Sequence, residues 1–495
     1  MKKIVIKLIN TLYFITSACL LLSACKSFNK ERNRAVEQKD ENVVVYLTSS
    51  DKTYTFSKMK IKLMALDSIS SETITLDPEN RYQTMHGFGA AITGSTCYNL
   101  LRMSPEDRSK FLISTFSVSD GMAYSYIRIS IGCSDFSLSE YTCCDQEGIE
   151  NFALTNEETQ YLIPVLKEIL SINPDVKILG SPWTCPRWMK VNNLIDLQPY
   201  NSWTSGQLNP AYYQDYARYF VKWIQAFAAE GITITSITPQ NEPLNRGNSV
   251  SLYMSWQEQS DFVNTALAPM LKSEKLKTSV YLFDHNYNYD NIEDQNDYPA
   301  KIYERGVDDD IVIGSAYHDY GGNLSELIDI HNKYPAKELI FTETSIGTWN
   351  NGKDFSLRLT EDMQQVALGT VNNMCRAVIV WNLMLDNERG PNRPDGCRTC
   401  FGAVDIASDY KTLSFNSHYY IIGHLSSVVK QGAVRIGLTG HADQSITASA
   451  FENPDGTFAL VLLNKDLNDK TITVNDGKNS FRHTIPAKSV ASYLW

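Results

Sequence analysis

Apolar residues in the middle of the chain follow a regular rhythm, in which a short apolar run precedes a longer stretch with helical spacing. The clearest helix is predicted over 212–229, where aromatic residues recur three and four positions apart before Gly231 ends it. Runs of this kind separated by helices favour a closed barrel over an open sheet. The predicted strands are 85–90, 124–129, 176–180, 232–238, 280–284, 312–316, 338–342 and 377–381. We therefore expect an α/β protein in which residues 81–415 form a (β/α)8 TIM barrel.

Short runs rich in β-branched or alternating residues lie on both sides of this region. They are 43–47, 59–66 and 73–76 on the N-terminal side, and 445–451, 458–463, 470–474, 481–485 and 491–494 on the C-terminal side. Asp455-Gly456 and Asp476-Gly477 stand between the C-terminal runs as hairpin turn signals. We expect residues 416–495 to form an attached β-sandwich domain that the N-terminal strands of residues 43–80 join.

The first residues have the pattern of an export signal. Lysines at positions 2, 3 and 7 precede an apolar run over 8–22, which is typical of a secretory signal rather than a spanning helix. The run ends in Leu22-Ser23-Ala24-Cys25, which resembles a bacterial lipoprotein processing box. We expect a lipoprotein signal peptide over 1–24, lipidation of Cys25 and a flexible tether over 25–42. The alternative is an ordinary signal peptide with an accidental cysteine.

These features place the mature protein outside the cytoplasm. We expect it to be anchored by lipid to the bacterial outer membrane, on either the periplasmic or the surface side, and to be monomeric. The formal net charge of −11, without a visible basic stripe, argues against a nucleic-acid partner. Of the 10 cysteines, Cys19 leaves with the signal and Cys25 would carry lipid.

Two of the remaining cysteines form a Cys-x-x-Cys motif. Export permits disulfides, so Cys397 and Cys400 could pair, whereas the adjacent Cys143 and Cys144 cannot easily pair with each other. A zinc site would need a second ligand pair, and no pair stands at a suitable spacing. We therefore expect no metal.

Polar and aromatic residues follow the apolar runs, and this is where a barrel places its chemistry. In chain order they are Arg128, Asp135, Ser181-Pro182-Trp183-Thr184, Asn241-Glu242-Pro243, Asp284-His285-Asn286, His318, Tyr320, Glu343 and Trp381-Asn382. Because the carboxyl ends of the strands meet at one face, these side chains are expected to lie together around the barrel mouth.

Two of them, Glu242 and Glu343, supply the pair of carboxyl groups that glycosidic bond hydrolysis needs. One donates a proton to the leaving oxygen, and the other attacks the anomeric carbon or activates water. Glutamates that end the fourth and seventh strands face each other across a barrel, where a separation of about 5 Å predicts retention of configuration. The Asn241 amide could bond a sugar 2-hydroxyl, while Arg128 and Tyr320 could hold Glu343 ionised.

Each candidate also has a structural interpretation. A single glutamate is most often a solvated surface carboxylate, although the stretch Thr238-Pro-Gln-Asn-Glu-Pro is an unusual context for one. Asp135 could cap a turn, Trp183 could belong to the core, and His318 could be a structural histidine rather than a pocket residue. For Asp284-His285-Asn286, the sequence favours neither a role in the site nor a purely structural role.

The chain resembles glycoside hydrolase family 30, which contains glucosylceramidase and microbial β-1,6-glucanases. The matching stretches are HGFGAAITGS from His86, RISIGCSDFSLSEYTCCD from Arg128, SPWTCPRWMK from Ser181, YARYFVKWIQAFAAEGITITSITPQNEP from Tyr216, FTET from Phe341 and WNLMLDNERGPN from Trp381. They span most of the predicted barrel in the expected order.

The resemblance implies a barrel with an attached β-sandwich, no metal or organic cofactor, and a double-displacement mechanism. It makes Glu242 the acid/base and Glu343 the nucleophile. It also implies that Asp135, Trp183, Asn241 and Trp381 line the subsite for the non-reducing sugar. The sequence departs from the family pattern at two places. Cys143-Cys144 stand where relatives often have aromatic or small residues, and Asp319 stands where many relatives have Trp. These departures leave the glutamate pair intact but put the aglycone preference in doubt.

These observations predict a retaining β-glycoside hydrolase, with endo-β-1,6-glucanase activity favoured because a lipid-anchored exported enzyme suits polysaccharide breakdown. One alternative is a β-glucosidase similar to glucosylceramidase. A second is a non-catalytic surface lipoprotein that binds glycans, which predicts loss of a catalytic carboxylate. A phosphohydrolase or esterase is disfavoured, since there is no Gly-rich phosphate loop before a helix and no Gly-x-Ser-x-Gly elbow.

Overall fold

The structure is a computed structural model that describes residues 42–65, 73–287, 292–440 and 443–495. The predicted signal peptide, the lipidation of Cys25 and most of the tether lie outside these residues and stay predictions. In the described part of the chain, no helix combines the length and apolarity that crossing a membrane requires.

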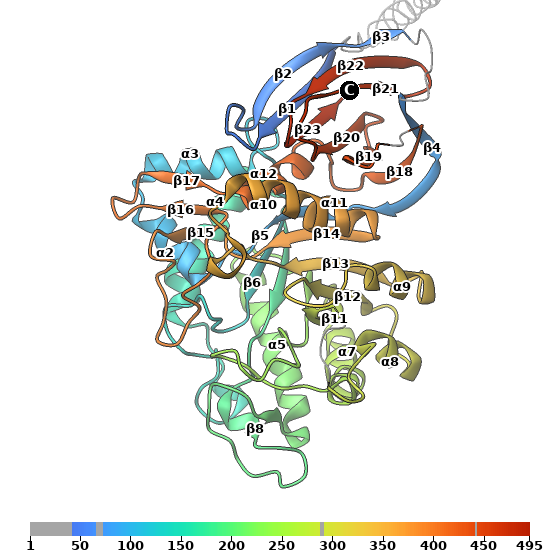
Figure 1. The fold of residues 1–495 in the computed structure, drawn as a ribbon. Coiled ribbons are helices and arrows are strands. Elements are labelled where there is room, and N and C mark those ends of the chain that lie inside the picture. The colour runs from blue at the N-terminus through green and yellow to red at the C-terminus, as the bar shows by residue number, and fades with distance from the viewer. Residues whose placement is uncertain (1–41, 66–72, 288–291, 441–442) are drawn as a thin grey trace, which may run out of the picture. The chain divides into compact units, whose positions relative to one another are not determined.

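Eight parallel strands form a barrel (Figure 1), as the alternation of strands and helices predicted. Their order in the sheet is β5-β14-β13-β12-β11-β10-β7-β6. The two edge strands, β5 and β6, meet through a bridge between Ala91 and Arg128 and a hydrogen bond from the Ser125 N–H to the Phe88 carbonyl (2.9 Å), which closes the barrel. The strands are β5 (Gly87–Ala90), β6 (Tyr126–Ser130), β7 (Lys177–Ser181), β10 (Ser236–Ile237), β11 (Ser279–Asn286), β12 (Val312–His318), β13 (Glu338–Glu343) and β14 (Cys375–Val380).

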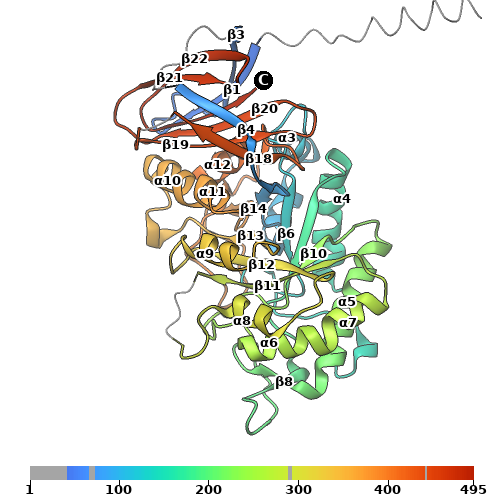
Figure 2. The same cartoon turned by 90° about the vertical axis from the view of Figure 1, so that its right-hand side faces the viewer.

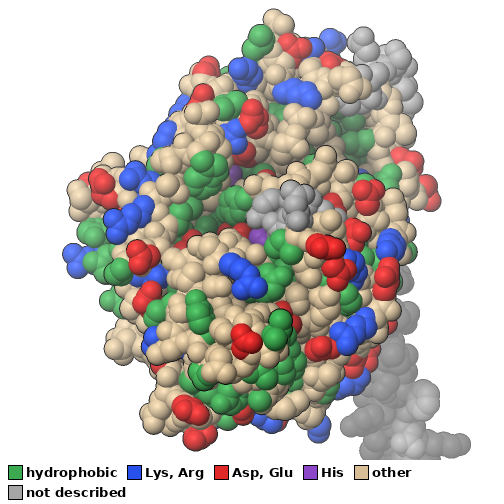
Figure 3. Space-filling model, turned by 60° about the horizontal axis from the view of Figure 1, so that its bottom comes forward, with side chains coloured by type: hydrophobic (Ala, Val, Ile, Leu, Met, Phe, Trp, Pro, Cys, Tyr) green, Lys and Arg blue, Asp and Glu red, His purple; other side chains and the backbone are tan. Residues whose placement is uncertain are grey.

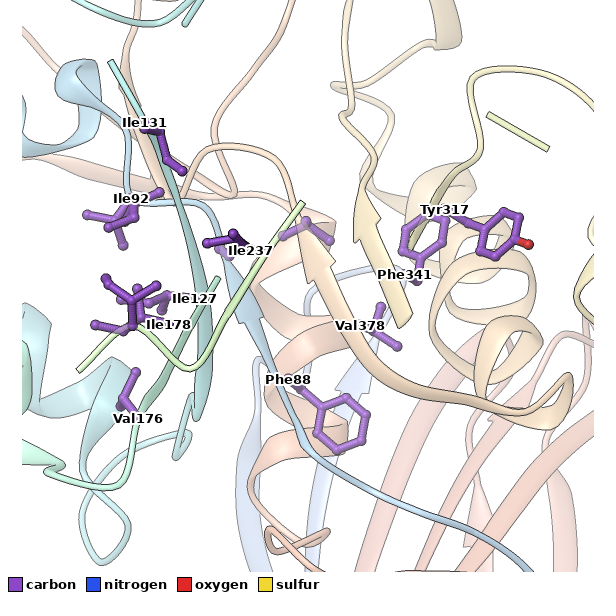
Figure 4. Close-up of a cluster of buried hydrophobic side chains, with 14 of the residues drawn as sticks. Phe88, Ile92, Ile127, Ile131, Val176, Ile178, Ile237, Tyr317, Phe341 and Val378 are labelled. Carbon is purple, nitrogen blue, oxygen red and sulfur yellow. The ribbon is translucent and has the colours of Figure 1, made fainter. Parts of the chain in front are cut away.

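Successive side chains along these strands point to opposite faces of the sheet. One set forms a small apolar cluster that includes Tyr126, Leu179 and Ile379. The alternate set, which includes Ile127 and Ile178, belongs to the large core outside the barrel (Figure 4). This two-sided burial explains why most of the barrel strands read as nearly continuous apolar runs.

Helices cover the outside of the barrel (Figure 1). The longest, α5, runs over Tyr213–Ala229, close to the predicted 212–229. Its Trp223 packs directly on Gly180 of β7, where a Cβ atom would lie 3.0 Å from the indole ring. The other helices are α2 (Gly94–Arg102), α3 (Pro105–Phe116), α4 (Ile163–Ile172), α6 (Trp256–Phe262), α7 (Ala268–Ser273), α8 (Tyr298–Arg305), α9 (Glu326–Lys333), α10 (Phe355–Asp362), α11 (Leu368–Asn372) and α12 (Ser417–Ser426). Single π-helical turns, Glu158–Leu162, Val263–Leu267 and Met363–Ala367, precede α4, α7 and α11.

A second sheet combines strands from both ends of the described chain, as predicted, in the order β2-β1-β23-β20-β19-β18-β4-β21-β22-β3. The N-terminal β1 pairs antiparallel with the C-terminal β23, so the sandwich needs both ends. Its strands are β1 (Asn42–Ser49), β2 (Ser57–Lys62), β3 (Met64–Ala65), β4 (Thr73–Thr84), β18 (Val434–Thr439), β19 (Ile446–Glu452), β20 (Phe458–Asn464), β21 (Lys470–Asn475), β22 (Asn479–Ile485) and β23 (Ser489–Leu494). Neither β18 nor the C-terminal half of β4 was among the predicted strands.

The helix α12 lies between the barrel and the sandwich (Figure 2). Its fully buried His424 bonds Ser492 Oγ of β23 through Nδ1 (2.8 Å) and Thr48 Oγ1 of β1 through Nε2 (2.9 Å). Two smaller sheets lie among the loops: β15 (Met384–Asp386), β16 (Val404–Ile406) and β17 (Leu413–Phe415) form one, and β8 (Lys190–Val191) and β9 (Gln207–Leu208) the other.

Candidate active site

A fully buried arginine in the middle of β6 connects candidate residues from four other strands. Arg128 donates from Nη1 to Glu343 Oε2 (2.5 Å) and from Nη2 to Asn241 Oδ1 (2.7 Å) and Asp284 Oδ2 (2.8 Å). Its Nε donates to Ser181 Oγ (3.2 Å). The guanidinium is rigid and planar, so these bonds fix the relative positions of the strand ends that carry their acceptors.

Asp284, at the end of β11, is the second fixed point of the site. It is fully buried and has a left-handed backbone conformation, with φ 64°. Its carboxylate accepts bonds from Arg128 Nη2 (2.8 Å), Thr238 Oγ1 (2.6 Å), Ser181 Oγ (3.0 Å), Thr342 Oγ1 (2.7 Å) and His318 Nε2 (3.0 Å). Burial raises the pKa of Asp284, but Arg128 and His318 outweigh burial and hold it far below its usual range.

Glu343 ends β13, as the predicted strand over 338–342 required. It is 6% exposed, and both carboxylate oxygens accept a hydrogen bond, one from Arg128 Nη1 (2.5 Å) and one from Tyr320 Oη (3.1 Å). Burial outweighs the positive charges of His318 and Arg128, so the pKa of Glu343 is raised above its usual value. Arg128 and Tyr320 contact Glu343 as predicted, but they do not lower its pKa overall.

Glu242 lies in a tight turn after β10. Its φ is 45°, and its N–H donates to the Asp284 carbonyl (2.8 Å), which fixes the direction of the side chain. Oε2 accepts bonds from Asn245 Nδ2 (2.8 Å) and Asn248 Nδ2 (2.7 Å), and Oε1 lies 3.4 Å from His318 Nδ1. Burial raises the pKa of Glu242, but the hydrogen bond and charge of His318, the charge of His285 and the hydrogen bond from Asn245 together outweigh it and lower that pKa to about 2.

His318 lies between two carboxylates, with Nδ1 facing Glu242 and Nε2 facing Asp284. Burial lowers the pKa of His318, but Glu343 and these two neighbours raise it to about 9. Glu242, His285 and His318 also present atoms within 4.8 Å of one another, which is the geometry of a possible three-ligand cation site among the described residues.

Glu242 and Glu343 therefore belong to one continuous chain of contacts, from Glu242 through His318, Asp284 and Arg128 to Glu343. They also lie close enough for the charge of Glu242 to raise the pKa of Glu343. Figure 3 shows a hollow in the molecular surface in which acidic and histidine side chains are visible.

Trp183 and Trp381 pack their aromatic rings against the guanidinium of Arg128. The guanidinium carbon is 4.9 Å from the Trp183 ring centroid and 5.4 Å from that of Trp381. The two rings stack on each other, with centroids 5.1 Å apart, and each residue is 1% exposed. Most of each ring is thus packed in the protein.

Asp135 follows β6 on a loop beside these rings. Burial raises the pKa of Asp135 well above its usual range, and the negative charges of Glu343 and Glu242 add to this effect. Its Oδ1 atom is buried and has no hydrogen-bond partner among the described residues. A buried carboxylate oxygen of this kind is suited to a ligand hydroxyl.

The predicted site residues thus lie together, with Arg128, Asn241, His318 and Tyr320 in direct contact within the network. The sequence analysis did not single out Asn245, Asn248 or Thr342. For Asp284, it favoured neither a role in the site nor a purely structural role. Asp284 follows an apolar strand, which is a usable signal, but its partners come from strands far apart in the chain.

Comparison with known proteins agrees with this geometry. Residues 85–429 match the glycosyl hydrolase family 30 TIM-barrel domain, and residues 432–493 match the family's β-sandwich domain. The chain belongs to glycosyl hydrolase family 30. The family predicted from the sequence motifs is confirmed, and so is the barrel with its attached sandwich.

Relatives in family 30 include two kinds of enzyme. The chain is 33% identical to endo-1,6-beta-D-glucanase BGN16.3 of Trichoderma harzianum, over 83% of this chain and 84% of the relative. It is 28% identical to lysosomal acid glucosylceramidase of Mus musculus, over 88% and 87%. The solved structure of the endo-beta1,6-glucanase BT3312 is 64% identical, covers 92% of this chain and 99% of its own, and superposes with a TM-score of 0.90.

Proposed function

We propose that this family 30 protein is a retaining β-glycosidase that cleaves β-1,6-linked glucan internally. The observation that carries the proposal is the buried network that joins Glu242 to Glu343 through His318, Asp284 and Arg128. The linkage rests on similarity, because the relatives at 33% and 64% identity are endo-1,6-β-glucanases.

In the first step, a Glu343 oxygen attacks the anomeric carbon while Glu242 gives a proton to the departing glycosidic oxygen. The C–O bond to the leaving sugar breaks and a glycosyl–Glu343 ester forms. In the second step, Glu242 takes a proton from water, whose oxygen attacks the same carbon and releases the sugar with its β configuration restored.

The acid role of Glu242 requires a proton that the ligand-free site keeps on His318. The pKa of Glu242 is lowered to about 2 and that of His318 is raised to about 9, so the pair holds one proton at neutral pH. The His318 Nδ1 to Glu242 Oε1 contact of 3.4 Å gives this proton a path to the carboxylate. We infer that substrate binding, which displaces water and removes the solvation of Glu242, moves the proton onto Glu242.

Asp135 and Asn241 are proposed to bind the hydroxyls of the non-reducing sugar. Asp135 Oδ1 lacks a protein partner, and Asn241 uses Oδ1 for Arg128, which leaves its amide N–H groups for a sugar hydroxyl. Trp183 and Trp381 pack their rings against the Arg128 guanidinium and so support the residue that holds Asn241.

Incubation with linear β-1,6-glucan tests the substrate, with β-1,3-glucan and cellulose as linkage controls and Glu343→Gln as the inactive control. We expect a ladder of β-1,6-oligosaccharides early in the reaction, with β anomers seen first by NMR. Release of glucose alone, or cleavage of the other glucans at an equal rate, would contradict the proposal. Binding without turnover would instead favour the glycan-binding lipoprotein.

The glucosylceramidase-like alternative is supported by the mouse relative at 28% identity. Hydrolysis of glucosylceramide in detergent micelles, together with inertness toward β-1,6-glucan, would favour it.

The lipid anchor is a separate proposal, supported by the Leu22-Ser23-Ala24-Cys25 box. The full chain produced in a bacterial host should enter the detergent phase on Triton X-114 partition, and Cys25→Ala should remain in the aqueous phase. Aqueous partition of both proteins would exclude lipidation.

A further inference from the structure

Two cysteines lie side by side in the wall of the candidate active site. Cys397 Sγ and Cys400 Sγ are 2.7 Å apart, so bond formation requires only a small movement. Cys400 is 5% exposed and packs in the same apolar cluster as Trp183 and Trp381. Cys397 is partly exposed and therefore open to a reagent from solvent.

The segment that carries this pair is fixed at both ends to the site. At one end, Arg393 donates from its N–H to the Ser137 carbonyl (3.2 Å) and from Nε to the Ser134 carbonyl (3.0 Å), on either side of Asp135. Gly396 lies so close to Asp135 that a Cβ atom would be 2.5 Å from its carbonyl oxygen.

At the other end, the segment is bonded to the residues that follow Glu343. The Phe401 N–H donates to the Ile346 carbonyl (2.8 Å), and the Thr348 N–H donates to the Thr399 carbonyl (2.9 Å). A bridge also joins Gly347 to Cys400. The Cys-x-x-Cys turn thus connects the loop of Asp135 to the loop that follows Glu343.

We propose that Cys397 and Cys400 form a disulfide that braces the sugar-binding wall of this enzyme, so that its affinity for substrate depends on its redox state. The Cys397 thiolate attacks one sulfur of an external small-molecule disulfide, which forms a mixed disulfide with Cys397 and releases the other half as a thiolate. Cys400 then loses its proton, attacks Cys397 Sγ and expels the second thiolate. The Cys397 thiolate and the Cys400 thiol together lose one proton and two electrons, and the external disulfide is reduced to one thiol and one thiolate.

The local chemistry favours Cys397 as the attacking group. Its contact with Cys400 lowers the pKa of the Cys397 thiol to about 6, despite partial burial, so it is largely ionised at neutral pH. A thiolate at Cys397 also places a negative charge near Asp135, where it raises the pKa of that carboxyl. Oxidation removes the negative charge of the Cys397 thiolate and joins the two ends of the Cys-x-x-Cys turn by a covalent bond.

Peptide mapping tests the bond directly, because Arg398 stands between the two cysteines. Trypsin divides the region into peptides 390–398 and 399–411, which stay joined only by a disulfide. After treatment of the full chain with glutathione disulfide and alkylation, we expect the joined pair, which separates after reduction with dithiothreitol. Complete alkylation of both peptides after oxidation would overturn the proposal.

The functional part rests on the proposed glucanase activity and is measured with β-1,6-glucan. Reduction should raise KM about two- to tenfold, because the wall must then be ordered by the substrate, and leave kcat within about twofold. Cys397→Ser/Cys400→Ser should give one KM under both conditions, whereas Cys375→Ala, a buried cysteine of β14, should keep the redox response. Thermal midpoints confirm that each variant is folded.

Equal KM values for the oxidised and reduced wild-type protein would contradict the proposed effect of the disulfide on substrate affinity, even if the disulfide forms. A protein inactive on every β-1,6-glucan would instead contradict the proposed function, and the peptide map would still test the disulfide.

Discussion

Asp284 holds the site together because it is the acceptor for side chains from five other positions and lies between the two cations. Arg128 and His318 both point at its carboxylate, and all three residues are fully buried. A buried cation that loses its partner is strongly destabilising. The charge of Asp284, rather than its shape, is therefore what the network needs.

Asp284→Asn should lower the free energy of unfolding by about 3 kcal/mol, because Arg128 and His318 lose a shared counterion. It should also reduce kcat by about a hundredfold or more, because both catalytic candidates are positioned through these cations. Urea unfolding and initial rates measure the two effects. The same change at the exposed Asp294 is the matched control, expected within about 0.5 kcal/mol of wild type. An Asp284→Asn protein with wild-type stability would contradict this role.

His318 makes the stability of the protein depend on pH. Its folded pKa is raised to about 9 from 6.5, so its stabilising contribution is complete below pH 6.5 and is lost as pH rises through 9. A shift of this size corresponds to about 3 kcal/mol. Wild type should therefore lose stability between pH 6.5 and 9 relative to His318→Gln, measured by urea unfolding at each pH. Parallel curves for the two proteins would show that His318 does not hold the proton.

The candidate site was largely predictable at the residue scale, and the reason is geometric. Glu242, Glu343 and Arg128 each follow an apolar run, and a parallel barrel brings the ends of such runs to one face. Asn245 and Asn248 could not be predicted in this way. They reach Glu242 because the turn at φ 45° folds the chain back, and no strand pattern encodes that turn.

At the scale of elements, the strand β10 is much shorter than the hydrophobic pattern predicted. The apolar alternation predicted 232–238, but only Ser236–Ile237 pairs as a strand. The Ile178 N–H donates to Thr235 Oγ1 (3.1 Å) rather than to a backbone carbonyl, although the Thr235 N–H still donates to the Ile178 carbonyl (3.0 Å). A side-chain oxygen thus takes the place of one backbone acceptor where the predicted strand would have continued. The hydrophobic pattern does not show where a threonine side chain competes with the backbone for hydrogen bonds.

Closure of the barrel depends on the close approach of β5 to β6. At Gly89 a Cβ atom would lie 2.0 Å from the Tyr126 carbonyl oxygen, so Gly89→Ala must push the strands apart. We expect a loss of about 3 kcal/mol in unfolding free energy, measured by urea denaturation. Gly247→Ala, whose nearest neighbour would be at 3.4 Å, is the control expected near wild type. Equal stability of the two variants would contradict tight closure.

At the scale of the whole molecule, the sandwich and the barrel share a buried contact at α12. His424 bonds Thr48 and Ser492, and burial lowers its pKa to about 3, so it is neutral in the folded protein. The sequence predicted both domains and the contribution of the N-terminal strands. It gave no sign of this contact, because Thr48 and His424 are far apart in the chain and neither stands in a motif.

His424→Ala should lower the free energy of unfolding by about 2–4 kcal/mol, because it leaves a buried cavity and removes the imidazole hydrogen bonds to the hydroxyls of Thr48 and Ser492. Because the folded pKa of His424 is depressed, the wild-type contribution is present above pH 6.5 and is lost as pH falls toward 3. Unfolding at pH 7 measures the loss, and His331→Ala on the barrel helix α9 is the control. A His424→Ala protein as stable as the control would contradict the contact.

The central claim is that Glu242 and Glu343 act on one anomeric carbon from opposite faces. Chemical rescue by azide tests it most directly, using an activated β-glucoside and NMR of the glycosyl azide. Glu343→Gly should lose several orders of magnitude in turnover and regain part of it with azide, giving the α-glycosyl azide, whereas Glu242→Ala should give the β product. Near-normal turnover of Glu343→Gly without azide, or the same anomer from both variants, would contradict the account.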